Sequence, residues 1–296
     1  MLRLSFVAPV LLALGCATSA QRPPSSEERL LQLVEQIRQA DYAGDRQALR
    51  DLHAALASAP TGDAPRSLVL YWRGFALWRR AINGFNEKPA PDDLLADVNA
   101  ASAEFGTALG EDPKLVDAQA GLAACLGMRM YLHGKADDEM RALRSRVQAL
   151  FAEAEVLEPG NPRLLWVKGP MEWFTPKGSP PEMLDARQAK AIATYLRGLE
   201  GLPGSPRSGP EPLRPTWGEP ELHMSLAWSY LHRRVPDVAQ AEIHGRRALE
   251  LVPSWHYMRD ILMPQIEAAR TASRVAPRAG RPDARAPSGV NARARR

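Results

Sequence analysis

One spacing of small, large and proline residues recurs along the chain and constrains its fold more than any other feature. The pattern is small-x3-large-x2-Ala-x4-Pro. Its copies are Ala48, Leu52, Ala55 and Pro60; Ala101, Phe105, Ala108 and Pro113; Val147, Phe151, Ala154 and Pro159; and Ala241, Gly245, Ala248 and Pro253, where glycine takes the large position. The first three positions fall on one face of a helix, and the proline ends the helix about a turn later. The chain is therefore expected to repeat one amphipathic helix several times.

A second kind of helix accompanies this pattern and carries its own small residue. It is visible in Leu122-Ala123-x2-Leu126 and in Leu226-Ala227-x2-Tyr230, with Gly74 and Gly169 in the corresponding places. Together the two helices resemble the tetratricopeptide repeat, abbreviated TPR, over about residues 26–253. The resemblance implies an all-α, TPR-like solenoid of helical hairpins. It also implies a set of residues that pack the repeats together: Gly74, Ala101, Phe105, Ala108, Ala123, Phe151, Ala154, Gly169, Ala227, Ala241 and Ala248.

The repeats are longer than the family standard. Phe105 and Phe151 are 46 residues apart, whereas a TPR spans about 34 residues. We expect elongated hairpins, with the extra length in lengthened helices and loops near 83–92 and 133–137. HEAT-type repeats of about 40 to 47 residues are the alternative on length alone.

The C-terminal half departs from the pattern in three places. Pro170 should end or kink the first helix of the third unit. Five prolines between Gly201 and Gly218 predict a long loop, either a lid or a connector between repeats. A last helix, capped by Ser254 and reaching about Arg274, should cover the end of the solenoid over 254–274. Its covering residues are expected to be Trp255, Met258, Ile261 and Leu262.

The N-terminus is typical of an export signal over residues 1–20. Arg3 precedes an apolar run from Leu4 to Leu14, which is too short to span a bilayer as a stable anchor. Ala13-Leu14-Gly15-Cys16 resembles the lipobox of bacterial lipoproteins, although alanine stands where leucine is usual. The resemblance implies cleavage before Cys16 and lipid attachment to it, with ordinary cleavage after Ala20 as the alternative. We expect a periplasm-facing lipoprotein, in the outer more than the inner membrane, or otherwise a soluble periplasmic or secreted protein.

Positive charge is concentrated at the other end of the chain. From Arg274 to Arg296 there are seven arginines and one acidic residue, a net charge of +6, so the remainder carries −2 of the total +4. Residues 275–296 have few apolar side chains and are predicted to be a disordered basic tail. The tail is either inert or a contact for anionic lipid or cell-wall polymer. Export argues against nucleic acid as a partner.

The residues that carry enzyme chemistry lack the spacing that a site requires. The six histidines include no His-x3-His pair, and the sequence has no nucleophile elbow, phosphate-binding loop or dinucleotide fingerprint. Cys125 lies in an apolar stretch and is expected to be a small buried residue. We therefore expect a binding protein without a catalytic site, a metal or a cofactor.

Aromatic residues around the small positions are the candidates for binding. In TPR-like solenoids the first helix of each hairpin lines the concave groove, and this resemblance selects Tyr71, Phe75, Trp78, Arg79, Trp166, Trp173, Met224, Trp228 and His232. Aromatic and arginine side chains supply much of the binding energy at protein interfaces. The interpretation is a scaffold for a protein or peptide in the cell envelope. The alternatives are a small-molecule carrier that uses the same groove, and core packing by these large side chains.

Overall fold

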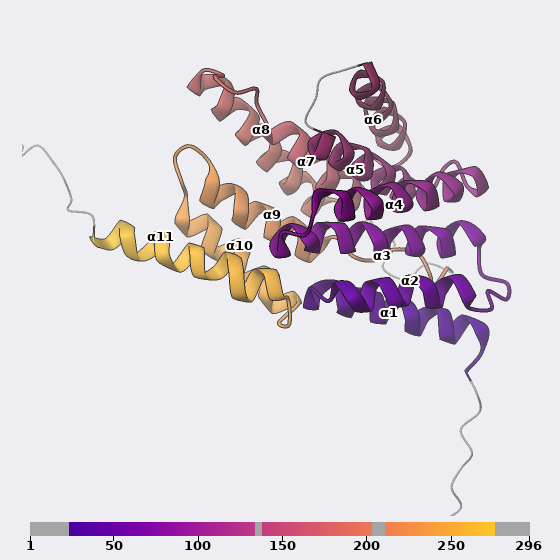
Figure 1. The fold of residues 1–296 in the computed structure, drawn as a ribbon. Coiled ribbons are helices and arrows are strands. Elements are labelled where there is room, and N and C mark those ends of the chain that lie inside the picture. The colour runs from indigo at the N-terminus through magenta and orange to yellow at the C-terminus, as the bar shows by residue number, and fades with distance from the viewer. Residues whose placement is uncertain (1–23, 134–137, 203–210, 276–296) are drawn as a thin grey trace, which may run out of the picture.

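The computed structural model describes residues 24–133, 138–202 and 211–275, and these residues form helices and turns without a β-strand. Five hairpins follow one another in the chain (Figure 1). They are α1 (Ser26–Ala43) with α2 (Arg46–Ser58), α3 (Arg66–Glu87) with α4 (Pro91–Glu111), α5 (Val116–His133) with α6 (Asp138–Leu157), α7 (Pro162–Trp173) with α8 (Pro181–Glu200), and α9 (Glu219–His232) with α10 (Val238–Leu251). A π-helical segment, η2 (Tyr257–Leu262), leads into α11 (Met263–Val275).

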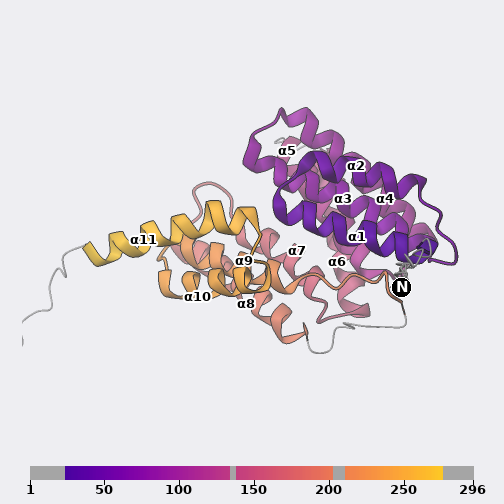
Figure 2. The same ribbon diagram turned by 90° about the horizontal axis from the view of Figure 1, so that it is seen from below.

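The hairpins pack in the order of a solenoid. We call the odd-numbered helices from α1 to α9 the A helices, and the even-numbered helices from α2 to α10 the B helices. Each B helix contacts its own A helix and the A helix of the next hairpin, and each A helix contacts the next A helix. The molecule is therefore an all-α, TPR-like solenoid with elongated hairpins, as the repeat pattern predicts. Figure 2 shows α1 to α5 at one end of this stack and α8 to α11 at the other.

The small residues allow these close contacts. All eleven residues of the predicted repeat-packing set are buried. The ring of Phe105 lies between two glycines, because a Cβ atom at Gly74 would be 3.0 Å from it and one at Gly121 would be 2.5 Å from it. A Cβ at Gly169 would lie 2.1 Å from the ring of Tyr195 on α8. A larger side chain at Gly121 or Gly169 would push the neighbouring ring away, and at Gly74 the space is already tight, which explains the small residues on the A helices.

Local sequence determines where several helices begin. Ser25 caps α1 in a capping box with Glu28, and Asn161 caps α7 through its side-chain oxygen. Pro170 does not end α7, which continues for three residues to Trp173. The Pro170 carbonyl still accepts a hydrogen bond from the Phe174 N–H at 3.4 Å, so the helical pattern of bonds resumes after the proline.

The C-terminal segment differs from the prediction at its start. Ser254 does not cap the helix, because the Trp255 N–H donates to the Val252 carbonyl in a turn and helical residues begin only at His256. Trp255, Met258 and Leu262 are buried as expected, and the fourth contact comes from Ile266 instead of Ile261, which is only partly buried. These residues pack against the last hairpin.

The two ends of the solenoid meet. The Tyr42 and Trp255 rings, from α1 and the start of the C-terminal segment, are in edge-to-face contact with centroids 5.1 Å apart. A Cβ at Gly44 would lie 3.2 Å from the His256 ring. The superhelix therefore closes on itself. Over the described ranges, no helix has the length and apolar character that crossing a bilayer requires.

Candidate partner-binding surface

Residues 211–218, which we call the strap, connect to the start of α9 and lie against the A helices. The strap has no helix or strand. Its Leu213 and Trp217 side chains are 2% and 3% exposed. Trp72 on α3 donates its indole N–H to the Leu213 carbonyl at 2.8 Å, and Arg163 on α7 donates to the Trp217 carbonyl at 3.1 Å. Part of the proline-rich loop is thus an ordered element of the core, while residues 203–210 lie outside the described ranges.

Trp217 fills the centre of an aromatic cluster. Its ring centroid is 5.3 Å from that of Phe75, 5.9 Å from Trp78 and 5.4 Å from Trp166. Its indole N–H donates to the hydroxyl oxygen of Tyr71 at 2.8 Å. Aromatic pairs at these separations stabilise beyond the burial of their area. The strap is therefore held by side chains of both α3 and α7.

Arg79 lies beside this cluster and connects three helices. Its guanidinium contacts Asp41 of α1 at 2.7 Å and lies 3.9 Å from Glu221 of α9, which also accepts a hydrogen bond from the Tyr42 hydroxyl at 2.8 Å. The guanidinium carbon is 5.2 Å from the Trp166 ring centroid. Burial alone would lower the pKa of Arg79, but the charges of Asp41 and Glu221 raise it above its ordinary value. Arg79 therefore stays charged and ties the ends of the solenoid together.

A second buried ion pair anchors the other side of the strap. Arg163 forms an ion pair with Asp117 of α5, and its Nη1 donates a hydrogen bond to the Trp217 carbonyl of the strap. The side-chain amide of Asn161 also donates to Asp117, at 3.3 Å. Burial would lower the pKa of Arg163, and the Asp117 charge outweighs this and raises it. Removing one partner of such a pair leaves an uncompensated charge in the core.

The structure therefore corrects the placement of five residues that were predicted to line an open groove. Tyr71, Phe75, Trp78, Arg79 and Trp166 are between 0% and 8% exposed. The physical reason is the strap, which occupies the face of α3 and α7 that a partner would otherwise reach. These five residues pack the core in this structure.

The remaining four residues of the predicted groove reach the surface together. We call Trp173, Met224, Trp228 and His232 the seam, because they lie where the end of α7 meets α9. The Trp173 and Trp228 centroids are 5.2 Å apart, and His232 stacks on Trp228 with centroids 4.5 Å apart. Trp173, Met224 and Trp228 are partly exposed, and His232 is exposed. The seam is an aromatic surface with a methionine beside it.

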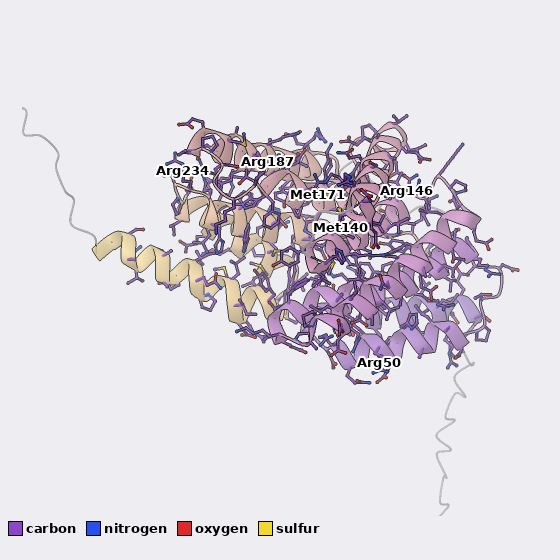
Figure 3. The ribbon with its side chains drawn as sticks, turned by 45° about the horizontal axis from the view of Figure 1, so that its top comes forward. Arg50, Met140, Arg146, Met171, Arg187 and Arg234 are labelled. Carbon is purple, nitrogen blue, oxygen red and sulfur yellow. The ribbon has the colours of Figure 1, made fainter. Side chains whose placement is uncertain are left out.

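Hydrogen bonds from arginines hold the ends of α7 and α9 against α8. Arg187 donates to the Met171 carbonyl at 2.8 Å, and Arg234 donates to both carboxylate oxygens of Asp185 at 2.9 and 2.6 Å. The Arg234 N–H also donates to Gln188. Figure 3 shows Met171, Arg187 and Arg234 along one side of the helical stack. The seam is therefore supported by fixed helix ends.

Other large apolar side chains are exposed near the connections between the two helices of a hairpin. Of the nine large hydrophobic side chains that are exposed within the described ranges, five lie at or beside the connection from an A helix to its B helix: Phe85, Tyr131, Phe174, Met183 and Val235. Phe85 and Tyr131 contact each other with ring centroids 6.1 Å apart. Scattered surface hydrophobics are ordinary, so these residues carry no binding argument of their own.

Sequence reasoning missed the residues that close the groove. Leu213 and Trp217 were assigned to a polar loop, and Asp41, Asp117 and Glu221 were not singled out. The one available signal was Trp217 itself, a large aromatic residue within a proline-rich segment. The ion-pair partners carry no such signal, because carboxylates on helices usually face solvent.

No point in the described parts of the chain is surrounded by three or more histidine, cysteine, aspartate or glutamate side chains that could hold a metal. Burial raises the pKa of the Cys125 thiol, which makes it a poor nucleophile. Cys16, the predicted lipidation site, lies outside the described residues.

No protein-family model and no curated protein matches the chain. Among solved structures, the chain is similar to a thermophilic TPR protein from Thermus thermophilus. The two share 16% sequence identity over 83% of this chain and 100% of that chain, with a TM-score of 0.46.

Proposed function

We propose that this protein is an exported, lipid-anchored scaffold that binds a protein or peptide partner in the cell envelope. The observation that carries the binding proposal is the seam, an aromatic surface left open on a solenoid whose central face is filled by its own strap. Tryptophan and methionine are enriched in protein interfaces, and tryptophan is frequent among the residues that dominate their energy. Binding without catalysis fits a structure in which the most strongly buried charges are paired with one another.

Site-specific crosslinking in cells tests partner binding. A photoreactive residue would replace His232, which is exposed in the seam, and in a matched variant it would replace Ile243, which is 57% exposed on α10. We expect a defined crosslinked product from position 232 and none from position 243. Absence of a product at both positions would contradict the scaffold proposal, and equal products at both would remove the seam from it.

Anchoring and export rest on the sequence around Cys16. Replacing Cys16 by serine removes the sulfur atom to which the lipid would be attached, and the remaining apolar run is too short to hold the chain in a bilayer. We expect Cys16→Ser to move the protein from the membrane fraction to the soluble fraction. A substitution of the buried Cys125 by alanine serves as the control for cysteine loss. Equal membrane retention of Cys16→Ser and the unaltered protein would contradict lipid anchoring.

A further inference from the structure

The seam continues the interface that already holds the strap. Trp166 and Trp173 are seven residues apart on α7, about two helical turns, so they lie on the same face. On α9, Ser225 accepts a hydrogen bond from the Trp166 indole at 2.9 Å, and Trp228, three residues later, contacts Trp173. One row of contacts between α7 and α9 therefore runs from the half covered by the strap to the half that is open.

The strap shows what kind of segment this face accepts. It lacks regular secondary structure and contains Pro212 and Pro215, so it enters its contacts with reduced backbone freedom. Leu213 and Trp217 are its anchors, and its carbonyl oxygens accept hydrogen bonds from side chains of the A helices. Binding is thus achieved by two apolar side chains and by main-chain acceptors.

The ion pairs beside the seam favour a segment without a large net charge. Arg234 is paired with Asp185 in two hydrogen bonds, and Lys190 lies 3.4 Å from Glu172. Arg234 and Lys190 are thus each matched by a carboxylate, which weakens the field that would attract a polyanion. Met224 adds a flexible apolar side chain that adapts to different anchors.

We propose that the seam binds a proline-containing segment of a partner protein that lacks regular structure and presents leucine or tryptophan anchors, the same class of segment as the strap. This inference rests on the proposed scaffold function and names the ligand class of its binding surface. The strap occupies the first half of the face in every copy of the chain. The partner segment occupies the second half, at the ends of α7 and α9.

The probe is a fluorescein-labelled synthetic peptide with the sequence of residues 211–218, Glu-Pro-Leu-Arg-Pro-Thr-Trp-Gly, titrated against the purified full chain by fluorescence polarisation. We expect saturable binding that is lost when tryptophan and leucine in the peptide are replaced by alanine. Trp228→Ala and Trp173→Ala in the protein should each weaken binding about thirtyfold, the effect of truncating a dominant interface residue. Ile243→Ala, which removes an exposed apolar side chain on α10 outside the seam, is the control and should leave binding unchanged.

His232→Ala keeps the test decisive if a tryptophan variant fails to fold, since His232 is exposed at the end of α9. It should weaken peptide binding severalfold while far-ultraviolet circular dichroism stays the same. No binding to the unaltered chain would overturn the proposal. So would equal binding by the unaltered chain and the folded seam variants, which would place the peptide on the strap's own site. Crosslinking of one partner equally by the unaltered chain and Trp228→Ala would overturn the seam while leaving the scaffold function in place.

Discussion

Replacing Trp217 by alanine tests whether the strap is part of the core. The Trp217 side chain is 3% exposed and contacts three aromatic rings. Truncating a fully buried tryptophan costs about 3 to 5 kcal/mol of unfolding free energy, through lost transfer energy and the cavity left behind. A protein of this kind is stable by about 5 to 15 kcal/mol, so the variant should remain folded but be visibly weakened.

Urea denaturation followed by circular dichroism at 222 nm measures this loss. With an m value of about 3 kcal/mol/M, a loss of 3 to 5 kcal/mol lowers the midpoint by about 1 to 1.7 M. Trp217→Phe separates packing from hydrogen bonding, because phenylalanine keeps an aromatic ring but cannot donate to the Tyr71 hydroxyl. A double-mutant cycle of Trp217→Phe with Tyr71→Phe should give a coupling energy of about 1 kcal/mol.

Trp173→Ala is the comparison for this experiment. Because Trp173 is only partly buried, its truncation should lower the free energy of unfolding by less than that of Trp217. If Trp217→Ala lowers the unfolding free energy by less than about 1 kcal/mol, or by no more than Trp173→Ala, the strap is not packed in the core. The five aromatic and arginine residues beneath it would then be open to a partner after all, and the division between strap and seam would be refuted.

Three further outcomes follow from the packing and the charges. Gly169→Ala should destabilise the fold by about 1 to 3 kcal/mol, because its Cβ would lie 2.1 Å from the Tyr195 ring. Gly106→Ala should stabilise the fold by about 0.5 to 1 kcal/mol, because nothing lies within 4 Å of the added Cβ. Equal melting temperatures of the two variants would contradict this. Arg79→Met should lower the free energy of unfolding by about 3 to 5 kcal/mol, because it leaves the carboxylates of Asp41 and Glu221 buried without their cation. An unchanged midpoint in urea denaturation would show that these ion pairs are not buried. Burial, with a neighbouring histidine, lowers the pKa of His223 from 6.5 to about 4. Below pH 6.5 the unfolded chain binds a proton at this histidine before the folded chain does, so the melting temperature should fall as the pH falls from 6.5 to 4. The fall should be smaller in His223→Gln. Parallel pH profiles of the two proteins would show that His223 does not cause it.

The helical architecture could be predicted because its signal is local. Alanine and phenylalanine at i, i+4 and i+7, followed by proline, specify an amphipathic helix and its end within a dozen residues. The same reasoning found the small contact positions. At Gly74, for example, an added Cβ would lie 3.0 Å from the Phe105 ring. Of the end or kink expected at Pro170, the end does not occur, and the cap expected from Ser254 is absent. The end of a helix depends on which backbone donors and acceptors find partners, and tertiary packing decides that.

The aromatic groove could be predicted only in part. The A-helix rule selected nine side chains as groove residues, yet it could not say which of them another part of the chain would cover. Trp166 and Trp173 share a face of α7 and have the same local pattern, but the first is buried and the second is partly exposed. The difference comes from Trp217, more than forty residues away in the chain.

The sequence by itself thus determined the helices, their pairing into hairpins and the small residues at their contacts, since each depends on neighbours within one or two repeats. Only the tertiary structure decided that the strap fills the central face and that the ends of the solenoid meet. Those features depend on contacts between distant residues, such as the Trp72 indole with the Leu213 carbonyl and the Tyr42 hydroxyl with Glu221, 141 and 179 positions apart. Periodicity reports which face of a helix is apolar. It carries no information on which distant segment buries that face, because the gain from removing apolar surface from water is the same whichever segment covers it.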